Sequence, residues 1–90
     1  MSKMILFFFM FLTSQQVLAW KEDTDRPGSD YTHYNVNSPE ECQQACWNED
    51  KCLAWTYVRP GVQGRSARCW LKDSVPPSRR DSCCISGRSH

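Results

Sequence analysis

Hydrophobic residues in this chain form short clusters separated by turn-forming residues, a pattern typical of short strands. Tyr31, Tyr34 and Val36 lie in a segment rich in aromatic and β-branched residues, where we expect a strand. Cys52 to Val58 shows the same enrichment and predicts a central strand with alternate side chains on opposite faces. These two clusters predict two strands of a small β-sheet.

The remaining clusters complete the predicted sheet. Arg68 to Lys72 resumes as a strand after a polar loop, so that it forms a long-looped hairpin with the preceding strand. Prolines at 76 and 77 break the chain, because proline cannot donate to a strand ladder. We expect Asp81 to Ser86 to form a last, short edge strand.

One segment has the signals of a helix rather than a strand. Ser38 can cap a helix that starts at Pro39, and Glu41 stands three residues after Ser38, the spacing of a capping box. The predicted helix runs from Pro39 to about Asn48. Cys42 and Cys46 share one face at the i, i+4 spacing, so both sulfurs should point to the interior.

The two ends of the chain differ from this central region. A short basic start, an eight-residue apolar run and Val17-Leu18-Ala19 fit a signal peptide over residues 1–19, with the mature chain beginning at Trp20. The apolar run is too short to span a bilayer, which needs about 20 apolar residues, so we expect no membrane anchor. We expect residues 20–29 to form a flexible lead-in, residues 30–87 the compact domain and residues 88–90 a fraying C-terminal tail.

Six cysteines in so short an exported chain predict a disulfide framework. Pairing Cys42 with Cys69 and Cys46 with Cys52 would tie the helix to the hairpin, although six cysteines allow about fifteen pairings. Adjacent Cys83 and Cys84 leave three alternatives, which are a vicinal bridge, an intermolecular bridge that makes a dimer, or a rearranged internal pairing. We otherwise expect a monomer. Zinc is disfavoured by the irregular cysteine spacing.

Charge is distributed unevenly along the mature part. Residues 20–50 hold eight acids and two bases, whereas residues 51–90 hold eight bases and two acids. Either the two halves neutralise each other across the folded surface, or the basic half presents a face to an acidic partner. The acidic half and the predicted export argue against nucleic-acid binding.

The cysteine and aromatic pattern resembles a PAN/Apple domain. The resemblance rests on Asp30-Tyr31, on Ser38 through Cys42 and Cys46, on Cys52-Leu53-Ala54-Trp55-Thr56-Tyr57, and on Cys69-Trp70-Leu71-Lys72. It implies a small disulfide-rich α+β fold with one helix packed on a short antiparallel sheet, and it supports the two helix-to-sheet bridges. It further implies an extracellular adhesion role without catalysis. Apple domains of blood proteases join their ends by a third bridge, whereas here no cysteine precedes Cys42.

Candidate chemistry is confined to recognition. His33 has no nucleophile in a recognisable context, so we expect no enzyme, no cofactor and no metal. Aromatic and cationic side chains on or beside the hairpin are candidates for contacting a ligand, together with a basic pair near the C-terminus: Tyr57, Arg59, Arg68, Trp70, Lys72, Arg79 and Arg80. Each aromatic residue has the core as its alternative location, and one of Trp55 and Trp70 should be core.

These features lead to two functional hypotheses. The first is a secreted, non-catalytic adhesion module that binds an extracellular carbohydrate or protein. The alternative is a small secreted effector or protease inhibitor that acts through protein–protein contact, with the loop from Arg59 to Ala67 as its binding loop.

Overall fold

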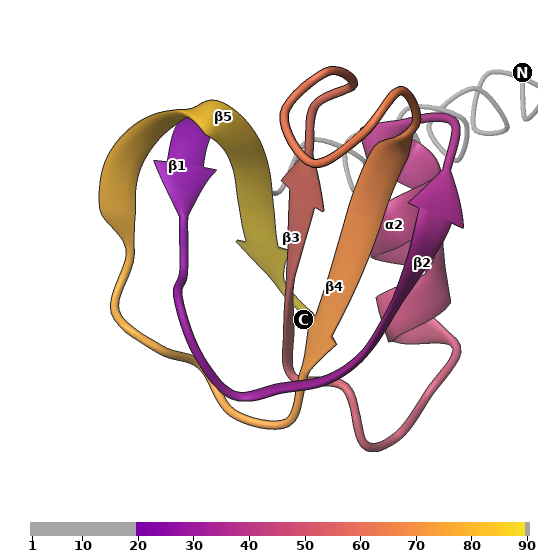
Figure 1. Cartoon of the computed structure of the whole chain (residues 1–90). Helices are drawn as coiled ribbons and strands as arrows, with labels where there is room; N and C mark the ends of the chain where they lie inside the picture. Colours follow the sequence, from indigo (N-terminus) through magenta and orange to yellow (C-terminus); the bar gives the residue numbers. More distant parts are fainter. Residues whose placement is uncertain (1–19, 90) are drawn as a thin grey trace, which may run out of the picture.

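A computed structural model describes residues 20–89, and within this range it holds five strands and one helix. All strand pairs are antiparallel, and the sheet order is β1-β5-β3-β4-β2 (Figure 1). This arrangement confirms the predicted α+β fold, one helix on an antiparallel sheet. The elements are β1 (Trp20–Asp25), β2 (Asp30–Val36), α2 (Pro39–Trp47), β3 (Ala54–Val58), β4 (Ala67–Lys72) and β5 (Arg79–Arg88).

Helix α2 forms where its capping residues predict it. Ser38 has an extended backbone, and its Oγ accepts a hydrogen bond from Glu41 N at 3.2 Å. The Glu41 carboxylate accepts from Asn37 N at 2.9 Å, so the capping side chains satisfy two backbone donors. Cys42 and Cys46 are buried, as expected from their spacing, and Gln43 is buried with them.

Strand β3 is the centre of the sheet and of the core. All five of its residues are buried, since β4 and β5 flank it and α2 packs against it. Trp55 is fully buried and meets the Trp20 ring edge-on at a centroid distance of 5.7 Å. Trp55 is therefore the core member of the pair Trp55 and Trp70.

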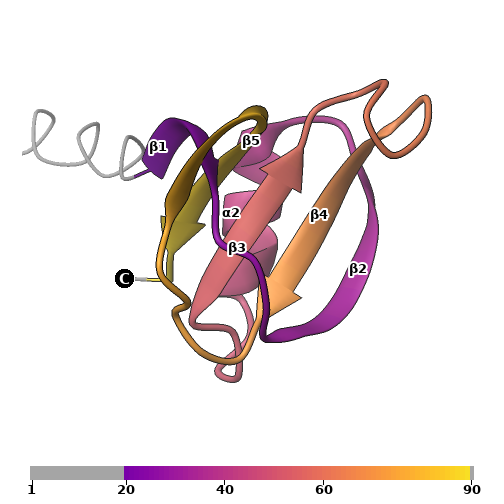
Figure 2. The same cartoon turned by 60° about the vertical axis from the view of Figure 1, so that its left-hand side comes forward.

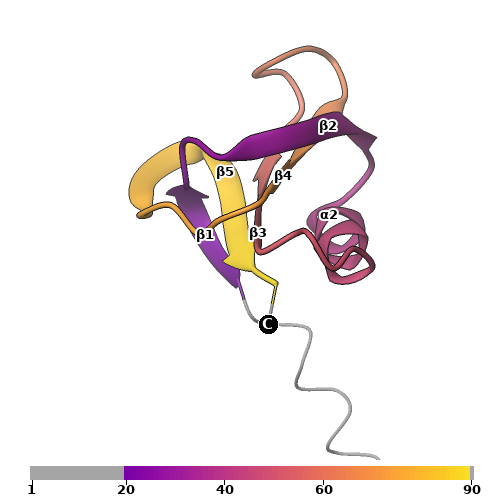
Figure 3. The same cartoon turned by 90° about the horizontal axis from the view of Figure 1, so that it is seen from below.

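Helix α2 covers one face of the sheet only, seen behind β3 in Figure 2 and to one side of β3 and β4 in Figure 3. We call this the helix face and the opposite side the open face. The Cys42–Cys69 bridge places Cys69 on the helix face. Strand alternation then places Trp70 on the open face, together with Thr56, its register partner on β3.

The N-terminal prediction of a flexible lead-in is wrong for residues 20–25. These residues form β1, which pairs with β5 from Trp20 opposite Gly87 to Asp25 opposite Arg79. The strand was missed because its sequence, WKEDTD, is almost entirely polar and mostly exposed. Backbone pairing and the buried contact of Trp20 order it without hydrophobic alternation.

The C-terminal predictions are also corrected. Strand β5 is ten residues long rather than short, and it lies between β1 and β3 rather than at an edge. Arg88 belongs to β5, and Ser89 is buried and donates its backbone N–H to Leu53 O at 2.9 Å, so these residues are not a fraying tail. The predicted signal peptide and His90 lie outside the described residues.

The sheet is strongly curved, because its two edge strands are joined by only four residues. Residues 26–29, the link segment, connect β1 to β2 at opposite ends of the strand order. A flat sheet would separate these edges by about 19 Å, whereas five chain steps reach at most about 18 Å. Gly28 and Ser29 have positive φ, so the link segment turns rather than extends. It therefore crosses in front of the open face, as Figure 1 shows along its lower edge.

Candidate functional site

A pocket of about 280 Å³ lies between the open face and the segments that curve over it. Residues of β3 and β4 form its floor, the link segment and its flanking aspartates form one wall, and β5 and the loop after β3 contribute the rest. Its size is near the lower end of the range for small-molecule sites. The fold thus holds a concave site on the side that α2 leaves uncovered.

The floor combines an indole with a buried hydroxyl. Trp70 lines the pocket, stacks on His33 at a centroid distance of 4.1 Å and donates from Nε1 to Gln63 Oε1 at 2.9 Å. Thr56 is 2% exposed, and its Oγ1 has no hydrogen-bond partner among the residues that the structure describes. A buried hydroxyl without a partner is costly in a protein interior. Thr56 is the polar group of the floor that still offers a hydrogen bond.

Lys72 fixes the link segment over the floor. Its side chain is 2% exposed, and its ammonium lies 2.5 Å from Asp30 Oδ1 and donates to Gly28 O at 3.1 Å. Burying a lysine is tolerated when the charge is paired and hydrogen-bonded, as it is here. Lys72 therefore lines the pocket with its charge already neutralised, rather than presenting a free cation.

The opposite wall contains a disulfide between adjacent residues. Cys83 and Cys84 are bridged, with their Cα atoms 3.7 Å apart, and this is the vicinal alternative of the three that the sequence left open. The pair lies in a large bulge, because β1 advances by two residues from Glu22 to Thr24 while β5 advances by five, from Arg80 to Ile85. The bulge gives β5 the arched shape visible in Figure 1 and turns both sulfur-bearing residues toward the pocket.

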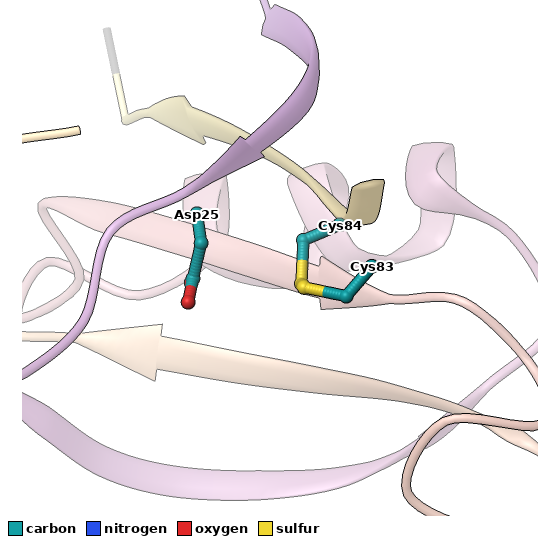
Figure 4. A group of neighbouring side chains, drawn as sticks. All are labelled: Asp25, Cys83 and Cys84. Carbon is teal, nitrogen blue, oxygen red and sulfur yellow. A yellow bond between two sulfur atoms is a disulfide. The ribbon is translucent and has the colours of Figure 1, made fainter. Parts of the chain in front are cut away.

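Asp25 stands beside this bridge (Figure 4). A carboxylate oxygen of Asp25 and the two sulfurs lie within 4.8 Å of one another. The grouping has the residue types of a metal site, but metals bind thiolates, and bridged sulfurs carry no such charge. We therefore assign Asp25 and the bridge as a polar and an apolar portion of the pocket wall.

The other two bridges hold α2 to the sheet. Cys42 is bridged to Cys69 and Cys46 to Cys52, the scheme considered from spacing and family resemblance. Their sulfurs are buried on the helix face, away from the pocket. All six cysteines are paired within the chain.

The cationic residues predicted to contact a ligand do not form one anion-binding patch. Arg59 pairs with Glu22 at 3.1 Å and Asp23 at 3.0 Å, and it also donates to Ser82 O. Arg68 donates to Asn35 Oδ1 at 2.7 Å and to His33 Nδ1 at 3.0 Å. Acids of the N-terminal half thus hold Arg59, and likewise Lys72 through Asp30, whereas the partners of Arg68 are an amide and an imidazole.

The remaining predicted residues are scattered. Arg79 and Arg80 are exposed at the start of β5, where Arg79 lies 3.9 Å from the Asp81 carboxylate. Tyr57 is 6% exposed and shares the helix face with Cys69, its register partner, so it is a core residue rather than a contact residue. Of the seven predicted residues, Trp70 and Lys72 line the pocket.

Sequence reasoning missed several residues of the pocket. Thr56 was assigned to a strand without a role, and the lead-in prediction removed Asp25 from consideration. Asp25 and Asp30 flank a turn-forming cluster, which signals a reversal of the chain but not what the turn covers. Nothing in the local pattern indicates that the link segment crosses the sheet.

Tyr31 and Arg26, two of the residues with shifted pKa values, lie outside the pocket lining and connect elements of the fold. Burial, followed by its hydrogen bond to Glu49 Oε1 at 2.6 Å, raises the pKa of Tyr31 well above its ordinary value. This contact ties β2 to the residues after α2. Burial, with repulsion from Arg88 as the lesser cause, lowers the pKa of Arg26, which donates to Pro76 O at 2.8 Å.

Comparison with known protein families assigns a family to this fold. The family model of the PAN domain matches residues 24–72, slightly more than half of the chain. The chain belongs to the PAN domain family. PAN domains are non-catalytic modules that bind proteins or carbohydrates, and their disulfides are typical of an extracellular setting. The match ends at Lys72, so β5 and its vicinal bridge lie beyond it.

A curated relative of this PAN domain is an uncharacterized protein of Acanthamoeba polyphaga mimivirus. It is 37% identical over 51 residues, which cover 57% of this chain and 13% of that protein. The chain thus spans a small part of the relative that it matches. Among residues 20–89, no helix is long and apolar enough to cross a membrane.

Proposed function

We propose that this PAN domain is a secreted carbohydrate-binding module whose ligand enters the open-face pocket. The observation that carries the proposal is Thr56 Oγ1, a buried hydroxyl without a partner on the floor of that pocket. A sugar hydroxyl can both donate to and accept from this group, which would remove the cost of its burial.

The neighbouring groups suit the same ligand class. Sugars present an apolar ring face and a rim of hydroxyls, and they are bound by aromatic rings together with carboxylates and carbonyls. The pocket offers Trp70 for the ring face and Asp25 for the rim. Secretion is supported by the signal-peptide pattern and by the three bridges, because disulfides persist in oxidising compartments.

A glycan array with the full chain, expressed in a eukaryotic secretory host, tests the function. We expect the secreted product to begin at Trp20 by mass spectrometry and to retain a restricted set of glycans. Val62→Arg should abolish retention by placing a long cation at the pocket wall, because Val62 lines the pocket and is 54% exposed. Val75→Arg is the matched control at a valine that is 36% exposed and does not line the pocket.

Two results would contradict this proposal. A folded protein that retains no neutral, amino, acidic or sulfated glycan would exclude the carbohydrate function. Equal retention by the two arginine variants would place binding elsewhere on the surface. The secretion proposal is tested independently of glycan binding. A protein that keeps residues 1–19, or that stays inside the cell, would contradict it.

A second candidate function, contact with a protein such as a protease, is favoured by the loop after β3. Every residue from Pro60 to Ser66 is exposed, and Val62 is the apolar side chain at its tip. The loop is braced by a bond from Gly61 N to Gly64 O at 2.7 Å. A protease panel assayed with the oxidised protein tests this function, and uncleaved protein without inhibition of any protease would exclude an inhibitor.

A further inference from the structure

The fixed charges of the pocket are unequal, and the imbalance comes from one residue. Three charged side chains line the pocket, Asp25, Asp30 and Lys72. Lys72 and Asp30 form a close pair at 2.5 Å and cancel. Among residues 20–89, Asp25 has no ion-pair partner, so the lining carries one net negative charge.

The basic residues beside Asp25 in the chain and in the strand register contact other groups. Arg79 is the register partner of Asp25 on β5, but its guanidinium lies toward Asp81. Arg26 follows Asp25 in the chain and donates its side chain to Pro76 O. Arg59 is held by the acids of β1. A cationic group of a ligand would therefore meet Asp25 without displacing another base among the described residues.

The position of Asp25 is fixed and its surroundings are partly apolar. Its Oδ1 accepts from Arg26 N at 2.7 Å, which orients a half-buried carboxylate and leaves its other oxygen for a second donor. The Cys83–Cys84 bridge lies beside it (Figure 4), and a disulfide has no hydrogen to donate. A carboxylate in such a setting forms its strongest hydrogen bonds with a cationic donor.

From these observations we infer that the pocket selects an amine-bearing sugar, a hexosamine, over neutral and acidic sugars, with Asp25 as the residue that contacts the amine. The inference rests on the proposed carbohydrate function and names its ligand class. An acidic sugar would bring a second negative charge to Asp25, and like charges at close range disfavour binding.

Two matched sugar series test the selection with the full secreted chain. Glucosamine and glucuronic acid each differ from glucose in one substituent. The matching series of galactosamine, galactose and galacturonic acid shows whether a preference depends on the charge or on the stereochemistry of the sugar. Affinities are measured by NMR titration at a pH of about 6.5, below the usual pKa of an amino group. We expect the amine to bind about five- to tenfold more tightly than the neutral sugar, and the acid to bind more weakly still.

Asp25→Asn is the decisive variant, because the amide oxygen can still accept from Arg26 N while the charge is removed. We expect the three sugars of a series to bind it within about twofold of one another. Asp73→Asn is the matched control, since Asp73 is an exposed acid that does not line the pocket and gives the same change in net charge. It should leave the preference unchanged.

Results that differ from these expectations would contradict either the sugar preference or the carbohydrate function itself. An acidic sugar that binds as tightly as the amine, or a preference that survives in Asp25→Asn, would overturn the selection while leaving the carbohydrate function intact. If neither series binds but the array retains glycans, the hexosamine assignment fails and the function stands. If the array is also blank, the proposed function itself fails.

Discussion

The two faces of the sheet use disulfides in different ways. On the helix face, the Cys42–Cys69 and Cys46–Cys52 bridges span 27 and 6 residues and are fully buried. On the open face, Cys83–Cys84 joins neighbours, and Cys83 is half-buried at the pocket. A bridge stabilises chiefly through the loop that it closes, so the first two hold the fold together. The third shapes β5 where the pocket forms.

The same contrast extends to the polar groups. Near the helix, caps such as Ser38 and Glu41 satisfy backbone donors at the start of α2, and the unpartnered Gln43 Nε2 and Trp55 Nε1 are buried away from the pocket. On the open face, Thr56 keeps an unpaired hydroxyl and Asp25 an unpaired charge. Unsatisfied polar groups reduce stability, and Thr56 and Asp25 are the ones that a ligand in the pocket can reach. The comparison predicts that variants on the helix face lose stability and variants on the open face lose binding.

Removal of a long bridge should have the largest effect on stability. We expect Cys42→Ala with Cys69→Ala to lower the free energy of unfolding by about 2 to 5 kcal/mol, enough to leave so small a domain largely unfolded at about 37 °C. Cys83→Ala with Cys84→Ala should cost less than about 1 kcal/mol, because the bridge closes almost no loop. Urea unfolding followed by circular dichroism measures both. Equal losses would show that the vicinal bridge also supports the fold.

Substitution of Gly87 should cause the next largest loss of stability. A Cβ there would lie 2.9 Å from Trp55 Cζ2 and 3.0 Å from Cε2, and the buried indole has little room to move. We expect Gly87→Ala to destabilise the fold by about 1 to 3 kcal/mol through overpacking. Ser82→Ala, an exposed position in the same strand, is the control and should change stability by less than about 0.5 kcal/mol. A shift in the midpoint of urea unfolding measures the difference between the two variants. If Gly87→Ala leaves the midpoint unchanged, the Trp55 side chain can move aside, and the overpacking prediction is wrong.

Loss of the helix cap should have a smaller effect. Ser38→Ala removes the acceptor of Glu41 N and should cost about 1 kcal/mol. Thermal unfolding compared with Ser66→Ala, in the exposed loop after β3, isolates the cap from a general effect of losing a serine. If the two variants melt together, capping contributes little beside the two bridges that already hold α2.

The helix face was also the more predictable from sequence. The Ser38-Pro39 start and the i, i+4 cysteines are local signals, and local signals determined α2 and its buried side. The hairpin strands were found because they are rich in aromatic and β-branched residues. These elements are confirmed within a residue or two of their predicted bounds.

The structure of the open face could not be predicted from local sequence patterns, because it depends on contacts between residues far apart in the sequence. Strand β1 is polar and is ordered by its partner, and the pocket exists because the link segment must join opposite edges of the sheet. The aromatic and cationic character of the hairpin made Trp70 and Lys72 candidates for contacting a ligand, but it could not reveal the pocket that they line or the pairing of Lys72 with Asp30. Ion pairs between residues far apart in the sequence determine which charges a pocket offers to a ligand. Reasoning from a single sequence does not reveal those pairs.

Thr56→Val should have the smallest effect on stability and the most informative one on binding. The substitution replaces a buried, unpartnered hydroxyl by a methyl group of similar shape. No hydrogen bond within the described chain is lost, so unfolding should change by less than about 0.5 kcal/mol or shift toward greater stability. Glycan affinity should fall severalfold, because the sugar then loses its partner on the floor.

Thr32→Val provides the control for that variant. Thr32 is a half-buried strand threonine whose register partner is Leu71, so it does not lie in the pocket. It should leave glycan affinity unchanged. Urea unfolding and array retention measured on the same samples separate the two effects. A Thr56→Val protein that loses stability and keeps its affinity would reverse the assignment of the two faces, because Thr56 would then serve the fold rather than the ligand.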